Sequence, residues 1–326
     1  MPTSEAGTGF HAKEIIGQGS RNKSAREWQC NLMNPDVHVT SRRPVALAGL
    51  SQLMARSLGA ADLKVGLLDG PVMVGHPGFS AAKIKWFCQR DVAELGARDV
   101  AAVHATSTAG VLVAGRRSGA LGICPEITLV TRSVFRSPAA RSAGTTTWME
   151  LADALVELAD AGARIVNMSL SLATGIPTEH RAVQDALDYV TAHGVIVVAA
   201  AGNEGAINST VVTRHRSVLP VVAYNLQGRP WKISNIGRSI GQRGIGVVVD
   251  GLMSLGAHGM LRPFGGTSAA AAIVTGAVAL ILSELPKTRP EELISAMKGG
   301  PSRRTSVVPP LMNAWRAFGS LLAARS

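Results

Sequence analysis

The sequence predicts an α/β fold in which a mostly parallel sheet has helices on both of its faces. Short apolar runs such as 65–68 and 195–199 alternate with segments of ten or more residues that have helical periodicity. These runs are apolar at successive positions, as expected for strands that are buried on both faces. Hydrophobic residues make up 46% of the chain and aromatic residues only 4%, and 35 glycines are present, which favours close packing of small side chains.

The chain of 326 residues is long enough to bury a large core. Residues 1–43 are polar and have no sustained period, so we expect a flexible N-terminal arm. Residues 44–60 repeat apolar side chains at helical spacing, which predicts one amphipathic helix docked on the main body. No internal repeat or change of composition follows, and we expect residues 61–326 to form a single main domain.

The first predicted strand ends at Asp69, which follows the apolar run 65–68 and precedes Gly70-Pro71. An aspartate at this point lies at the carboxyl end of a parallel strand, where open α/β sheets place their functional sites. An Asp-Gly-Pro sequence is also typical of a simple turn.

His104 lies between two predicted elements. Residues 81–89 predict a helix and 100–103 a short strand, and the small residues at 105–115 predict a tightly packed helix. A single histidine in this position is usually a helix cap or a hydrogen-bonded core residue.

The rest of the chain continues the alternation. Strands are expected at 127–130, 164–170, 195–199, 218–223 and 246–249, helices at 148–161, 179–193, 290–297 and 311–322, and loops at 136–147 and 171–178. Right-handed crossovers between parallel strands bring all the carboxyl ends to one edge of the sheet. Asp69, Ser169 and Asn203 are therefore expected at the same edge.

Gly265-Gly266-Thr267-Ser268 opens directly into an apolar run, 269–282, that predicts a buried helix. The glycines let the backbone turn tightly, and Thr267 and Ser268 are typical of a helix N-terminus. A serine there lies among backbone N–H groups that have no partner inside the helix, which would stabilise a developing oxyanion. Taken alone, such a serine is more often an ordinary helix cap.

Composition limits the kinds of partner, cofactor and location that we expect for this chain. The net charge of +11 is spread over small basic clusters without interleaved aromatics or a Cys/His finger, so we expect no specific nucleic-acid binding; an acidic peptide is at least as good a candidate. No run approaches the roughly 20 apolar residues of a membrane span, and no apolar signal segment begins the chain. The three cysteines are scattered without metal-ligand spacing, so we expect no disulfide framework, metal or cofactor, and a cytoplasmic location.

With its elements in this order, the sequence resembles the subtilisin-like serine proteases, the subtilases (peptidase family S8). Five stretches over about 62–283 are similar to that family's motifs: 65–70, 104–110, 167–170, 200–203 and 266–270 with Gly276. Within the family, the phrase 68–72 followed by His76-Pro77 is most similar to the subtilases that process ribosomally made peptides such as cyanobactins.

The resemblance implies a three-layer subtilisin-like fold and a serine endopeptidase that works through an acyl-enzyme. Asp69, His104 and Ser268 would form the catalytic triad, in the chain order known for subtilisin. The Asn203 amide would contribute to the oxyanion hole. The implied substrate-binding residues are Ser169, Leu170, Ser171, Ala200, Ala201 and Gly202, and the last three would form a pocket for a sizeable substrate side chain. A peptide or protein is the implied partner.

The sequence departs from the family pattern at Gly70 and Pro71 after the aspartate, Ala105 and Ser107 in the histidine motif, Ser171 in the substrate strand and Ala272 in the serine motif. Gly70 stands where the family commonly has a hydroxyl that supports the aspartate. The loop 115–122 lacks carboxylates, so the family's calcium site in that loop is expected to be missing.

Three activities remain open on the sequence. The first is an endopeptidase of narrow specificity, such as one that matures a precursor, because residues 1–60 do not resemble the pro-segment of a secreted subtilase. The second is a catalytically impaired subtilase that binds a peptide or partner without cutting it, for which Ala105, Ser107 and Ala272 are the reason. The third is a transpeptidase, in which an amine intercepts the acyl-enzyme formed by the same triad.

Overall fold

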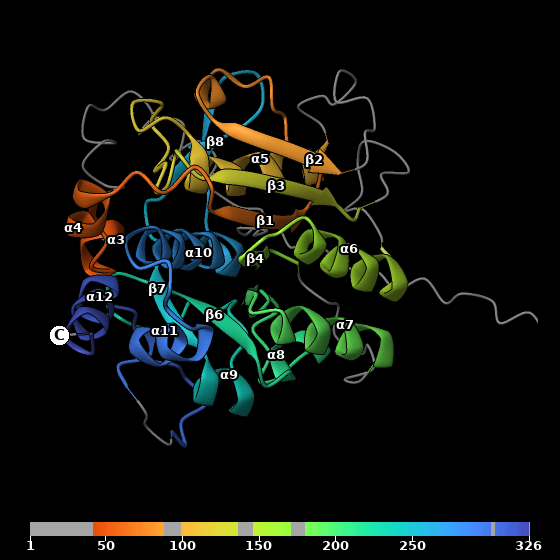
Figure 1. The fold of residues 1–326 in the computed structure, drawn as a ribbon, viewed down its shortest axis with the longest axis vertical. Helices are drawn as coiled ribbons and strands as arrows, with labels where there is room; N and C mark the ends of the chain where they lie inside the picture. The colour runs from red at the N-terminus through yellow and green to blue at the C-terminus, as the bar shows by residue number, and fades with distance from the viewer. Residues whose placement is uncertain (1–41, 88–98, 136–145, 171–179, 301–303, 326) are drawn as a thin grey trace, which may run out of the picture.

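The computed structural model describes residues 42–87, 99–135, 146–170, 180–300 and 304–325. Seven strands form one sheet in the order β2-β3-β1-β4-β5-β6-β7, and every pairing in it is parallel (Figure 1). The strands are β1 Lys64–Asp69, β2 Lys83–Phe87, β3 Thr128–Ser133, β4 Ile165–Met168, β5 Ile196–Ala200, β6 Val218–Tyr224 and β7 Ile245–Val248. The predicted parallel α/β sheet is confirmed.

Helices cover both faces of the sheet. On β5, Ile196 and Val198 pack with one hydrophobic cluster, and the alternate residues Val197 and Ala199 pack with another. The first cluster contains residues of α5 Val100–Val113, α10 Gly266–Glu284, α11 Pro290–Met297 and α12 Ala314–Ala323. The second contains residues of α6 Trp148–Asp160, α7 Arg181–Ala192 and α8 Val211–Arg214. This is the three-layer arrangement that was expected.

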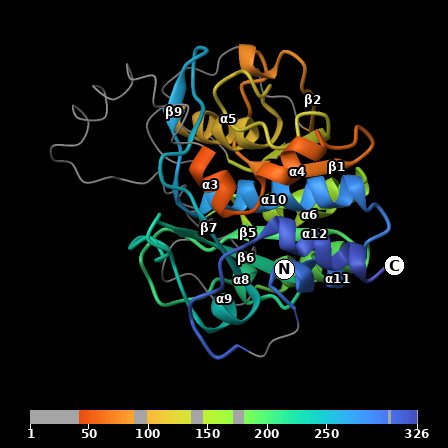
Figure 2. The same cartoon turned by 90° about the vertical axis from the view of Figure 1, so that its left-hand side faces the viewer.

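The helix α10 runs through the middle of the molecule (Figures 1 and 2). Every residue from Gly266 to Leu282 is buried, and the helix packs on α5 and on strands β4 to β7. It is also the one helix among the described residues that is long and apolar enough to cross a membrane, but 94% of that window is buried inside the protein. Its apolar length is therefore accounted for by the core.

Two predictions near His104 were wrong. Residues 83–87 form strand β2 at the edge of the sheet, not part of a helix, and this strand alternates Lys83 and Lys85 with apolar residues as an edge strand does. The predicted strand at 100–103 is the first turn of α5, because the Asp99 side chain caps that helix by accepting from Ala102 N at 3.0 Å. Residues 88 and 89 of the expected helix lie outside the described residues.

The predicted docking helix over 44–60 is broken into α3 Arg42–Leu47 and α4 Ser51–Arg56. Gly49 lies between them with φ 67°, and a Cβ there would come 2.5 Å from Asn313 Oδ1, so the chain turns where it meets the start of α12. Asn313 caps α12, which consequently starts at Ala314 and not at 311. Residues 1–41 of the predicted arm lie outside the described residues.

Besides α8, four short elements of the structure were not predicted from the sequence. They are the turn η2 Pro77–Phe79, the helix α9 Arg238–Arg243 and the antiparallel pair β8 Met253–Leu255 with β9 Leu261–Pro263. The pair packs on α5, and the turn contacts the same helix. The turn and the strand pair thus support the helix that carries His104, whereas α9 packs on β6 and α8.

Candidate active site

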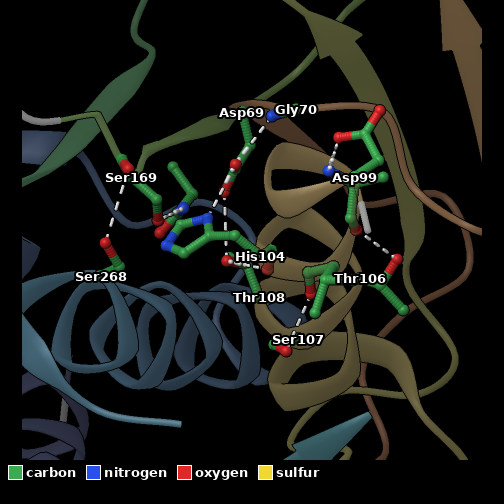
Figure 3. A network of polar contacts seen from close by, with 12 residues as sticks. Asp69, Gly70, Asp99, His104, Thr106, Ser107, Thr108, Ser169 and Ser268 are labelled. Atoms are coloured by element: carbon green, nitrogen blue, oxygen red, sulfur yellow. Dashed lines mark hydrogen bonds and ion pairs between the residues drawn. The ribbon is translucent and has the colours of Figure 1, made fainter. Parts of the chain in front are cut away.

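Asp69 and His104 form a buried pair at the carboxyl edge of the sheet. Asp69 is the last residue of β1 and is 0% exposed, and His104 lies on α5 and is 5% exposed. His104 Nδ1 lies 2.9 Å from Asp69 Oδ1, which also accepts a hydrogen bond from Gly70 N at 2.7 Å. Figure 3 shows the imidazole between the Asp69 carboxylate and Ser268.

This contact determines the histidine tautomer. An ionised carboxylate only accepts hydrogen bonds, so the proton of a neutral His104 resides on Nδ1. The lone pair of the ring then lies on Nε2, the atom that would act as the base. The ring is also fixed from the side by Phe264, whose centroid lies 5.6 Å away at an interplanar angle of 74°.

Ser268 lies in the first turn of α10 and is 5% exposed. Its Oγ is 3.5 Å from the backbone oxygen of Ser169, the residue that follows β4 (Figure 3). Gly266 begins the helix with φ 77°, a value that favours glycine. The serine hydroxyl therefore lies at a helix N-terminus, in the positive part of the helix field.

Asn203 faces the same helix start. Its Oδ1 accepts from Thr267 N at 2.9 Å and from Thr267 Oγ1 at 3.1 Å. A backbone N–H can only donate, so the atom facing Thr267 is the oxygen and Nδ2 is the end of the amide turned to other groups. Thr267 Oγ1 also accepts from Gly202 N at 3.2 Å, which joins the loop after β5 to α10.

Asn235 holds that loop from the other side. Its Oδ1 accepts from Glu204 N at 3.2 Å and from Ala206 N at 2.9 Å, its Nδ2 donates to Glu204 Oε2, and its backbone N–H donates to Gly202 O at 2.9 Å. Gly202 has φ 104°, and a Cβ there would meet the Asn235 amide. The loop that carries Asn203 is therefore fixed at both of its ends.

The end of β4 is tied to α10 by a buried network. Thr275 Oγ1 donates to Asn167 Oδ1 at 2.9 Å, and Asn167 Nδ2 donates to Ser169 Oγ at 2.7 Å. All three side chains are at most 2% exposed. The network fixes the backbone of Ser169, whose carbonyl oxygen faces the Ser268 hydroxyl.

The other predicted substrate-binding residues lie close to this edge. Leu170, Ala200 and Ala201 are buried, and Leu170 and Ala200 line a cavity of about 10 Å³ together with residues of α6 and α8. That volume holds about one water molecule. Ser171 lies outside the described residues, and a pocket for a sizeable side chain stays a prediction.

The departures in the histidine motif have structural partners. Ser107 Oγ donates to Leu255 O at 2.7 Å, and Ser254 Oγ donates to Ser107 O at 2.6 Å, which joins α5 to β8 reciprocally. The Ala105 methyl packs in the hydrophobic core, and α10 continues through Ala272 without interruption. Sequence reasoning missed Ser254, Thr267 and Asn235 as supports of the site.

No group of three or more His, Cys, Asp or Glu side chains suited to a metal ion occurs within the described ranges. Cys124 is fully buried, and this burial raises the pKa of its thiol to about 12. A thiol with that pKa is protonated at neutral pH and is a poor nucleophile. Ser268 is therefore the better candidate for attack on a carbonyl.

A profile of the subtilase family matches residues 60–299. Subtilisin NAT of Bacillus subtilis subsp. natto is 28% identical over 248 residues, which are 73% of this chain and 61% of the relative. Subtilisin of Bacillus pumilus is 28% identical over 248 residues, which are 73% of this chain and 85% of the relative. The chain thus spans about 61% of the length of the first of these relatives.

Solved structures with the same fold include two maturation proteases. The prenylagaramide maturation protease PagA matches with a TM-score of 0.74 and 24% identity, over 84% of this chain and 98% of that one. A serine-to-alanine variant of the protease domain of PatA matches with a TM-score of 0.73 and 26% identity, over 82% and 97% of the two chains.

Proposed function

The chain belongs to the subtilase family, and from this premise we propose that it is a serine endopeptidase with Asp69, His104 and Ser268 as its catalytic triad. One observation carries the proposal. The buried Asp69–His104 pair, at 2.9 Å, occupies the same sheet edge as a serine at the N-terminus of α10. An acid, a base and an alcohol in this arrangement are the parts required for acyl transfer.

In the proposed mechanism, Ser268 Oγ attacks the peptide carbonyl and gives its proton to His104 Nε2. His104 then donates that proton to the departing amine, which leaves an acyl-enzyme on Ser268. A water molecule, deprotonated by His104, hydrolyses this ester and restores the serine. Asp69 holds the ring through Nδ1 and stabilises its charged form.

The negative oxygen that develops on the carbonyl needs donors. The Asn203 Nδ2 and the backbone N–H of Ser268 would supply them, because Thr267 already holds the opposite end of the Asn203 amide. An extended peptide would add as a strand beside Ser169 and Leu170, with Ala200, Ala201 and Gly202 nearby.

The natural substrate is proposed to be a peptide or protein precursor. PagA and PatA are maturation proteases by name, and the protease domain of PatA shares 26% identity with this chain over 82% of its length. The impaired-subtilase and transpeptidase alternatives lead to different products, so one experiment separates all three.

That experiment incubates the full chain with a peptide library in water enriched in heavy oxygen and identifies the products by mass spectrometry. Hydrolysis puts heavy oxygen into each new carboxyl group, and the products disappear with Ser268→Ala. Joined peptides without heavy oxygen would instead reveal transpeptidation. A folded wild-type chain that binds peptides but makes no product would overturn the protease proposal.

A further inference from the structure

We propose that Thr108 is a positioning residue for the reaction: its hydroxyl holds the second oxygen of Asp69 and so fixes the carboxylate that orients His104. This inference rests on the proposed function for its kinetic consequence. Its structural part concerns the Asp69–His104 pair itself and is testable without catalysis.

The carboxylate of Asp69 is 0% exposed and depends on protein donors. Its Oδ1 is engaged by His104 Nδ1 at 2.9 Å and by Gly70 N at 2.7 Å. Both of these bonds are made to Oδ1, so on their own they would let the carboxylate plane rotate about that oxygen. Thr108 Oγ1 donates to Oδ2 at 3.1 Å and supplies the second point that fixes the plane (Figure 3).

The residue next to Asp69 has no room for such a donor. A Cβ on Gly70 would lie 2.4 Å from the backbone oxygen of Ala101, in the first turn of α5. Any side chain at this position would push α5 away from β1. The close approach of α5 thus excludes a hydroxyl beside Asp69 and, at the same time, brings Thr108 within reach of Oδ2.

Thr108 follows His104 by four residues, so the two side chains lie on one face of α5. Its Oγ1 is 3.1 Å from the His104 backbone oxygen as well as 3.1 Å from Asp69 Oδ2. The hydroxyl has a single proton, and the charged carboxylate is the stronger acceptor. Thr108 therefore donates to Asp69 Oδ2 while its side chain stays next to the His104 backbone on the same helix.

The first test is kinetic, on Thr108→Val, which keeps the shape of the side chain and removes the hydroxyl. We expect kcat to fall about 10- to 100-fold, the range for a lost hydrogen bond to a charged group, with KM unchanged. Thr108→Ser restores the hydroxyl and should recover most of kcat. The matched control is Thr106→Val on the same helix, whose hydroxyl bonds to Ala102 O and Met73 N and not to Asp69.

The second test needs no turnover. In a Ser268→Ala background, proton NMR observes the downfield Nδ1 proton of His104, whose shift reports the bond to Asp69. We expect Thr108→Val to move or broaden this signal, with Thr108→Ser and Thr106→Val close to the parent. An unmoved signal overturns the proposal, as does a kcat for Thr108→Val equal to that of Thr106→Val. An inactive wild type with a moved signal would refute the proposed function alone.

Discussion

The serine half and the histidine half of the site are held by different means. In the serine half, the helix start of α10 fixes Ser268, and Thr267 clamps Asn203 through its backbone N–H and its hydroxyl. In the histidine half, side-chain hydroxyls do the equivalent work. Thr108 holds Asp69, and Ser254 on β8 pairs with Ser107 on α5.

The difference between the two halves of the site corresponds to a difference between their sequence motifs. The serine half keeps the family's Gly-Thr-Ser and Asn motifs, whereas the histidine half departs from them at Gly70, Ala105 and Ser107. In the serine half, the backbone at the start of α10 places Ser268 and the kept motifs hold Asn203. In the histidine half, the side-chain hydroxyls of Thr108, Ser107 and Ser254 make the supporting contacts. The variants below test this contrast, in order of decreasing expected effect.

Asn203→Ala removes the side-chain donor of the serine half. We expect kcat to fall roughly 10²- to 10³-fold with little change in KM, because the donor acts on charge that develops in the transition state. Steady-state kinetics on a cleaved peptide measures this. Asn208→Ala, a turn residue of the same loop whose Oδ1 accepts from Ser209 N, is the control and should be unaffected. A kcat for Asn203→Ala near that of wild type would remove Asn203 from the oxyanion hole.

Asn235→Ala removes the support of the Asn203 loop and not the donor itself. The Glu204 and Ala206 N–H groups lose their acceptor, so we expect about a tenfold loss in kcat and a loss of about 1–3 kcal/mol in the free energy of unfolding. Asn225→Ala is a matched control, because Asn225 Oδ1 accepts from Gln227 N and Arg229 N in an exposed turn. Equal kcat values for the two variants would show that the loop needs no such support.

Ser254→Ala tests the histidine half. Removing its bond to Ser107 O should cost about 1 kcal/mol of unfolding free energy and reduce kcat by less than about tenfold, because α5 stays packed on α10. Ser283→Ala deletes a comparable hydroxyl on α10, which bonds to Ala279 O and Ala60 N. We expect the control to lose stability without losing kcat; a greater kinetic effect in the control would contradict the assignment.

His76→Asn has the smallest expected effect and concerns stability alone. His76 Nδ1 accepts from Gly78 N at 2.9 Å, and burial lowers the pKa of His76 below its ordinary 6.5, while a backbone contact with Met260 offsets part of this. The unfolded state then binds more protons than the folded state just below pH 6.5, so the free energy of unfolding decreases as pH falls through that window.

Asparagine keeps an acceptor for Gly78 N but does not titrate in this range. Chemical denaturation between pH 7.5 and 5 should therefore give a shallower pH dependence for His76→Asn than for wild type. Parallel curves for the two proteins would show that His76 contributes nothing to acid sensitivity.

The sequence alone predicted those strands and helices whose residue pattern is contained in one continuous stretch. Continuous apolar runs predicted β4, β5 and β6, and helical periodicity predicted α6, α7 and α11. The edge strand β2 was misread because its alternation spans only five residues, and β8 and β9 are three residues each, too short for any period. The side chain of Asp99 caps the start of α5, and a pattern of apolar residues does not reveal such a cap.

The same division applies to the site. Asp69, His104, Asn203 and Ser268 were assigned from their resemblance to the subtilase motifs, and the structure brings the elements that carry them to one edge of the sheet. Asn235 and Ser254 support the site from 31 and 147 residues away, and such contacts leave no local pattern. Thr108 does follow a local pattern, because its spacing of four from His104 places both side chains on one face of α5.

The central claim is that Ser268 is a nucleophile activated by His104, and covalent labelling with a fluorophosphonate tests it directly. Peptide mapping by mass spectrometry should find one adduct, on Ser268, and the rate of labelling should collapse in His104→Ala while that variant remains folded. An adduct on another residue, or equal labelling of Ser268 with and without His104, would contradict the account.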